Sequence, residues 1–261
     1  MKPVTRGEFL CLMGASAAMM AGGCACPCKC GAKPRYALQL YSIYKIFWKA
    51  PEKTLAALKA GGYDGVEFYN YGGKTAKELR GMCEAAGLKA MGTHLNGDVA
   101  LVGDALKKTL DFAAEAGFES LVTPHAKRDS RDGYRRFGHE MGLAAEAADA
   151  YGIKVGIHST YHHFTTRYGE ETAWDMIYRE ASPKLYQQID TANTFHVGYD
   201  VVALLKKYPN RHFSIHAKVT IQPNASPPDI SVMAFLQNFN ATVWKRSLAS
   251  SVLAHLIAQS L

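Results

Sequence analysis

Seven polar side chains stand at comparable places in this sequence of 261 residues, each close to the end of a short apolar run. Histidine nitrogens and carboxylate oxygens are donors that divalent cations such as Mn, Co, Zn and Mg accept from proteins. A cation held by such groups polarises a bound oxygen, and a neighbouring carboxylate or histidine can move a proton. The seven residues are Gln39, Glu67, His94, His125, His158, Asp190 and His216.

The elements that carry these residues form a weak repeat of roughly thirty residues. Each copy has an alanine-rich amphipathic stretch, a glycine, a short apolar run and then a polar residue. Ala, Leu, Lys and Glu favour helix, and a glycine after the last turn adopts the left-handed conformation that ends it. Four copies end their helical stretches in this way, at Gly62, Gly87, Gly117 and Gly152.

The short apolar runs predict strands that are buried on both faces, because they are too brief for helices. Helices alternating with such strands predict right-handed βαβ units and a parallel sheet. We expect the first strand at residues 36–41, the sixth at 185–190 and the seventh at 212–217. Seven such strands, without a glycine-rich phosphate loop, favour an α/β fold of the (β/α)8 TIM-barrel type over an open sheet.

In a barrel of this type the active site lies at the carboxyl end of the strands. A single histidine at a strand end is more often a hydrogen-bonded core residue than a ligand. Seven polar residues that end separate repeats favour a common site instead.

Five segments resemble the sugar phosphate isomerase/epimerase family, whose xylose-isomerase-like barrel also houses inosose dehydratase, ketose 3-epimerases and endonuclease IV. They are Ala37–Ser42, Gly65–Tyr69, Gly92–His94, Ile189–Asn193 and Asn210–Lys218. The resemblance covers about residues 36–218. It implies a divalent metal cation bound through Asp190 and His216, with Glu67 and His94 facing a small sugar-like substrate. We expect Gln39 and His125, which end strands in the same way, to bind the substrate too.

The chain departs from this family at the fifth strand. Relatives carry a His-Asn-His segment with a glutamate following, whereas this chain reads Ile157-His-Ser-Thr-Tyr-His-His-Phe164. His158 or His163 must therefore replace the usual ligand. We take both as candidate catalytic residues and His163 as the further metal ligand.

The second departure follows Lys218. Relatives end with an eighth strand that bears a metal-binding, proton-moving glutamate, but this chain has one acidic residue there, Asp229, and no Glu. The segment 219–261 is read either as a divergent terminus with an atypical or incomplete eighth βα unit or as a shifted reading frame. Closure needs an eighth parallel strand, for which the candidates are Ile230–Leu236 and Val252–Ile257. Without an acidic group there, a weak or inactive enzyme is expected.

Residues 1–34 do not belong to the barrel domain, which we place at 35–218. A basic start leads into an apolar stretch, as in a secretory signal. Ala21-Gly22-Gly23-Cys24 resembles a lipoprotein cleavage box, so Cys24 is a candidate for lipidation and a membrane tether. Four of the six cysteines lie between Cys24 and Cys30. The expected location is the periplasm, either free or as a membrane-anchored lipoprotein.

The net charge of +7 allows a nucleic-acid partner, but the basic residues are scattered, so we expect none. Three functions follow from the site and the resemblance. The first is a metal-dependent isomerase, epimerase or related lyase that acts on a sugar by enediolate-type proton transfer. The second is a catalytically inactive sugar-binding barrel, favoured by the absent glutamate. The third is an endonuclease IV-like enzyme, opposed by the export signal and by too few metal ligands.

Overall fold

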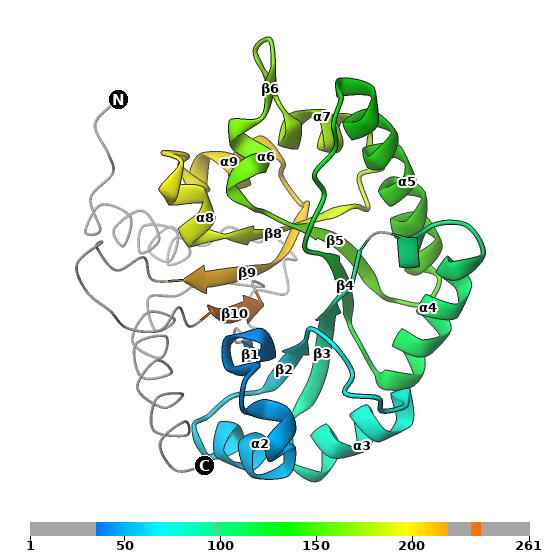
Figure 1. Cartoon of the computed structure of the whole chain (residues 1–261), viewed down its shortest axis with the longest axis vertical. Helices are drawn as coiled ribbons and strands as arrows, with labels where there is room; N and C mark the ends of the chain where they lie inside the picture. The colour runs from blue at the N-terminus through cyan, green and yellow to red at the C-terminus, as the bar shows by residue number, and fades with distance from the viewer. Residues whose placement is uncertain (1–34, 98, 219–230, 236–261) are drawn as a thin grey trace, which may run out of the picture.

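A computed structural model describes residues 35–97, 99–218 and 231–235. Helices alternate with strands along most of this length, as the repeat predicts (Figure 1). The strands of the main sheet are β1 (Arg35–Gln39), β2 (Gly65–Phe68), β3 (Lys89–His94), β4 (Ser120–Thr123), β5 (Lys154–His158), β8 (Tyr186–Asp190), β9 (His212–Lys218) and β10 (Ser231–Phe235). A short hairpin is formed by β6 (Arg167–Tyr168) and β7 (Glu171–Thr172).

The helices lie mainly around the outside of the strands (Figure 1). They are α2 (Pro51–Ala60), α3 (Ala76–Ala85), α4 (Asp104–Ala116), α5 (Arg131–Asp149), α6 (Tyr161–Thr165), α7 (Ala173–Glu180), α8 (Thr191–His196) and α9 (Val201–Lys207), with 3-10 turns η1 (Leu40–Ile43), η2 (Phe47–Lys49) and η3 (Val99–Leu101). In the described ranges no helix has both the length and the apolar character needed to cross a bilayer.

The main sheet is a closed barrel with the strand order β1-β10-β9-β8-β5-β4-β3-β2. Seven strands are parallel to their neighbours in the series from β1 through β9, which confirms the predicted α/β barrel. The eighth, β10, falls inside the predicted candidate segment Ile230–Leu236, but it runs antiparallel to both β1 and β9.

The expectation of a parallel eighth strand was therefore wrong in direction. Residues 219–230 connect β9 to β10, and a connection this short is near the lower limit for a parallel crossover. The antiparallel β10 closes the barrel between β9 and β1. The direction of the eighth strand is atypical, which agrees with the atypical eighth unit that the sequence indicated.

Glycines set the ends of the helices and the spacing between two of them. The four glycines that end the repeat helices, Gly62, Gly87, Gly117 and Gly152, all have φ between 69° and 83°, in the left-handed region. Gly138 lies where α5 packs on α7, and a Cβ there would stand 2.4 Å from the carbonyl oxygen of Ile177. The bare backbone lets these two helices approach closely.

Two predicted segments fall largely outside the described residues. They are the export signal with its Cys-rich tether at 1–34 and the C-terminal segment 219–261, of which β10 alone is described. The lipidated Cys24, the export route and the run Val252–Ile257 therefore stay predictions.

Candidate functional site

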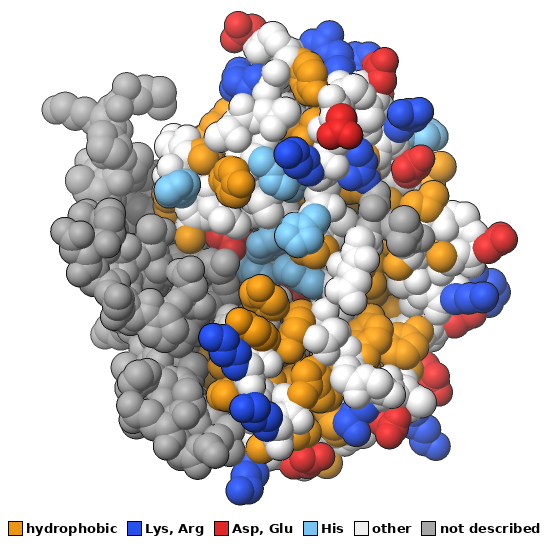
Figure 2. All heavy atoms as spheres, viewed as in Figure 1, with side chains coloured by type: hydrophobic (Ala, Val, Ile, Leu, Met, Phe, Trp, Pro, Cys, Tyr) orange, Lys and Arg blue, Asp and Glu red, His pale blue; other side chains and the backbone are white. Residues whose placement is uncertain are grey.

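The predicted polar residues come together because neighbouring strands end in register. Gln39 pairs with Glu67 across β1 and β2, and Asp190 pairs with His216 across β8 and β9. Since the strands are parallel, these ends share one face of the barrel. In Figure 2, histidine side chains gather near the middle of that face.

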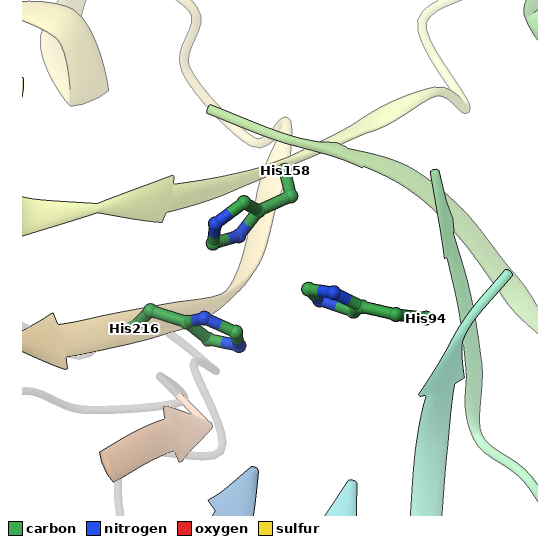
Figure 3. Close-up of side chains that lie close together, drawn as sticks. All are labelled: His94, His158 and His216. Atoms are coloured by element: carbon green, nitrogen blue, oxygen red, sulfur yellow. The ribbon is translucent and has the colours of Figure 1, made fainter. Parts of the chain in front are cut away.

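Three imidazoles form the centre of the site. His94, His158 and His216 end or nearly end β3, β5 and β9 and point toward one another (Figure 3). One ring nitrogen from each lies within 4.8 Å of the others. The side chains of His94 and His158 are 10% and 9% exposed and that of His216 is 2% exposed, so the group is nearly closed to water but reaches the surface. We call these three residues the histidine cluster.

Glu67 brings a carboxyl group to the site from β2. Its Oε2 shares a hydrogen bond of 2.8 Å with His216 Nε2 and lies 3.4 Å from His94 Nε2. The carboxylate is fully buried, and burial raises the pKa of Glu67 above its usual range. Burial also lowers the pKa of His94 to about 3, although Glu67 opposes that shift. This acid and base are therefore held close together in a medium that disfavours both of their charged forms.

The two carboxylate oxygens of Asp190 have different neighbours: one caps a helix and the other faces the site. Its Oδ1 accepts a hydrogen bond of 2.9 Å from the backbone N–H of Asn193 and so caps α8. Its Oδ2 lies 3.4 Å from His158 Nε2. The backbone N–H of Asp190 in turn donates to Ser159 Oγ at 2.8 Å, which ties the end of β8 to the end of β5. Asp190 thus borders the histidine cluster on the side of His158.

Gln188 is a member of the site that sequence reasoning missed. Its side chain is fully buried and contacts Glu67, His94 and His158. Alternation along a strand gave a signal, because Gln188 lies two residues before Asp190 and so faces the same side. The search gave weight to strand ends and to metal-ligating residue types, and an amide within a strand met neither condition.

Three predicted residues are not among the three histidines of the cluster. His163 is fully buried in α6, where its Nδ1 accepts a hydrogen bond of 3.0 Å from the backbone N–H of Thr160 as part of a helix cap. His125 is exposed just after β4. Gln39 is buried beside Glu67. The roles assigned to these three residues stay predictions, and the structure adds that a capping bond already occupies one ring nitrogen of His163.

The donor set fits a transition-metal cation. Three imidazole nitrogens, with the carboxylates of Glu67 and Asp190 beside them, suit Zn or Co, and they suit Mn less well. Mg prefers an oxygen-rich shell, which these residues do not offer. His94, His158 and His216 would hold the cation, with Glu67 as the charged neighbour.

Comparisons with known proteins give a consistent result. The family model for the xylose isomerase-like TIM barrel matches residues 55–231. No curated protein matches the chain.

Among solved structures, the chain is similar to a sugar phosphate isomerase/epimerase from Parabacteroides distasonis, with a TM-score of 0.64 and 21% identity over 76% of this chain and 80% of that one. A second protein of that description from the same organism has a TM-score of 0.62 and 20% identity over 85% and 88% of the two chains. An AP endonuclease of family 2 from Brucella melitensis has a TM-score of 0.56 and 16% identity over 84% and 89%. At these identities the structures show a shared fold. The family match spans most of the chain, and it confirms the resemblance seen in the sequence: this protein belongs to the xylose isomerase-like TIM barrel family.

Proposed function

We propose that the protein is a divalent-metal-dependent isomerase or epimerase that acts on a sugar or sugar derivative by moving a proton at the carbon beside a carbonyl group. The observation that carries this proposal is the buried Glu67 carboxylate, which lies within 3.4 Å of a nitrogen of His94 and of His216. These residues unite a potential cation site with a potential proton acceptor.

Each residue has a task in this proposal. His94, His158 and His216 hold the cation, which when bound would polarise the substrate carbonyl and acidify the neighbouring carbon–hydrogen bond. Glu67 accepts the proton, and burial favours this role because it raises the pKa of the carboxyl group and so makes the carboxylate a stronger base. Asp190, whose Oδ2 lies 3.4 Å from His158 Nε2, adds a second carboxylate at the edge of the cluster.

The choice of a sugar rests on the family. Two structurally similar proteins are described as sugar phosphate isomerase/epimerase, and both share the barrel over most of their length. The expectation of an inactive enzyme rested on the absence of a glutamate from the eighth strand. Glu67 reaches the histidine cluster from β2 and gives the site a carboxylate from another direction.

Solvent deuterium exchange tests the proposal. The full chain, loaded with Zn or Co, is incubated in deuterium oxide with a panel of ketoses and aldoses, and label at the carbon beside the carbonyl is followed by NMR. We expect metal-dependent incorporation that is lost in His216→Ala. A sugar that binds by calorimetry but exchanges no hydrogen would favour the rival function, an inactive sugar-binding barrel.

A further inference from the structure

We propose that Gln188 is a positioning residue that sets the orientation of the Glu67 carboxylate and the proton positions on His94 and His158 before a cation binds. The cation-binding consequence rests on the proposed function, whereas the proton positions do not. The inference comes from the hydrogen bonds that one amide on β8 makes to four side chains, one from each of β2, β3, β5 and β9.

Every hydrogen-bonding position of the Gln188 amide is directed at a neighbour in the barrel interior. A glutamine side chain offers two N–H donors and two acceptor lone pairs. Nε2 donates to Glu67 Oε1 at 2.8 Å and to Ser214 Oγ at 3.0 Å. Oε1 receives hydrogen bonds from His94 Nε2 at 2.8 Å and from His158 Nδ1 at 3.0 Å. The amide is therefore held in one orientation.

The first consequence concerns the Glu67 carboxylate. Because Gln188 Nε2 engages Oε1, the other oxygen, Oε2, is the one directed at the histidines, 2.8 Å from His216 Nε2. A buried carboxylate needs such donors, since the desolvation cost is otherwise left unmet. Gln188 thus meets part of the hydrogen-bonding need of Glu67 and fixes which oxygen faces the cluster.

The second consequence concerns protons on the imidazoles. A carbonyl oxygen has no hydrogen to give, so both ring nitrogens that contact Gln188 Oε1 must be donors. In the metal-free protein, His94 therefore carries a proton on Nε2 and His158 carries one on Nδ1. For His158 this leaves Nε2, the nitrogen that lies 3.4 Å from Asp190 Oδ2, as the position available to a cation. Metal-ligating histidines commonly gain their orientation from such a bond at the other nitrogen.

The adjacent residue provides a matched control. Gln187 has the same side chain on the same strand and is equally buried. Because side chains alternate along a strand, it points away from the site, and its Oε1 accepts a hydrogen bond of 3.1 Å from Trp174 Nε1. Methionine is similar in size to glutamine, so either replacement removes one buried amide with little change in volume. We expect only Gln188→Met to alter the site.

The first test needs no variant. Long-range proton–nitrogen correlation spectra of the 15N-labelled, metal-free full chain report which nitrogen of each histidine is protonated. We expect Nε2–H for His94 and Nδ1–H for His158, and the same pattern in Gln187→Met. A His158 ring without a proton on Nδ1 overturns the proposal.

The second test measures Co binding by calorimetry and by the visible spectrum of the bound cation. We expect Gln188→Met to weaken affinity by roughly 10- to 100-fold, the range seen when a partner of a ligating residue is lost. Gln188→Glu retains acceptors for His94 and His158 and should preserve their proton positions better than Gln188→Met. Unchanged Co affinity in a folded Gln188→Met protein contradicts the positioning role. Absence of Co binding in the unaltered chain counts against the proposed function, while the proton positions are still decided by the first test.

Discussion

Each end of the barrel holds an acidic side chain beside basic ones, but the two groups differ in their exposure to water. At the amino end, Arg35 meets Glu119 in a two-pronged ion pair, with contacts of 2.6 and 2.5 Å, and the two side chains are 33% and 37% exposed. At the carboxyl end, Glu67 is fully buried and shares its surroundings with His94 and His216. The first pair keeps partial contact with water, whereas in the second only His94 is exposed, by 10%.

This difference separates a structural pair from a functional one. The Arg35–Glu119 pair is complete within itself: the hydrogen bonds from Arg35 lower the pKa of Glu119, so both groups stay charged at neutral pH. At the other end burial works against the charge on Glu67 and on His94. Because burial disfavours the charged form of Glu67, its carboxylate is a stronger base than an exposed one. A bound cation would offset the cost of ionising this carboxyl group.

The largest effect is expected from removing the charge of Glu67. In Glu67→Gln the shape is nearly kept but the proton acceptor is lost, so the rate of solvent hydrogen exchange into a sugar substrate should fall by about a hundredfold or more. The melting temperature should change little, because a buried charge that opposed folding is removed together with its hydrogen bonds.

Glu119→Gln is the matched control at the amino end of the barrel. It removes one carboxylate from an ion pair that does not contact the site, and we expect exchange within a few-fold of the unaltered protein. If the two variants lost exchange equally, the functional contrast between the two ends would be wrong.

The next effect is stabilisation by a cation. A ligand that binds only the folded state raises the free energy of unfolding by about 2.7 kcal/mol when its concentration is about a hundred times its dissociation constant. We expect Zn or Co to do this in thermal melts. His216→Ala should lose the stabilisation, whereas replacing the exposed His125 by Ala should keep it. Both variants retain Cys24–Cys30, so metal bound there would contribute equally. Equal stabilisation of the two variants would show that the cation does not bind at the histidine cluster.

A smaller effect concerns pH and the buried His163. Burial lowers the pKa of His163 well below 6.5, so the folded protein keeps this ring neutral while the unfolded chain takes up a proton as the pH falls below 6.5. The unfolded state then binds more protons, and stability declines toward acid by up to about 1.4 kcal/mol per pH unit for one group.

Denaturant titrations between pH 7 and pH 5 measure that slope. His163→Asn removes the titrating ring, and the asparagine side chain can still accept a hydrogen bond from the Thr160 N–H. The free energy of unfolding of this variant should therefore fall less steeply toward acid, by up to about 1.4 kcal/mol per pH unit. An identical slope in both proteins would show that His163 does not contribute.

The features predicted from the sequence are those fixed by short stretches of chain. Glycine ends at Gly62, Gly87, Gly117 and Gly152 follow from backbone sterics alone, and the buried strands follow from brief apolar runs. Because parallel strands end on one face, the placement of His94, His158 and His216 followed once the barrel was predicted.

What the sequence could not supply depended on contacts between distant residues. The direction of β10 is seen in its antiparallel pairing with β1 and β9, and the apolar run that predicted a strand there does not encode a direction. Glu67 was predicted as a substrate-facing residue, but its contact with His216, 149 positions later in the chain, was not. Gln188 was missed because its importance lies in four hydrogen-bond partners and not in its residue type.

The smallest effect is expected from the Arg35–Glu119 pair itself. Partly exposed ion pairs contribute about 0.2–1 kcal/mol, because water and salt screen the charges. We expect a double-mutant cycle of Arg35→Met and Glu119→Gln to give a coupling in that range at pH 7. Since the pKa of Glu119 is lowered in the folded state, the coupling is present above the usual carboxyl pKa and is lost as the pH falls through the folded value. Urea titrations of the unaltered protein, the two single variants and the double variant measure the coupling free energy at pH 7 and its loss at pH 3. Co affinity should be the same in all four, because the pair lies at the opposite end of β1 from Gln39, at which the site begins. A cation affinity that fell with Arg35→Met would instead show that the amino end of the barrel helps to hold the site in shape.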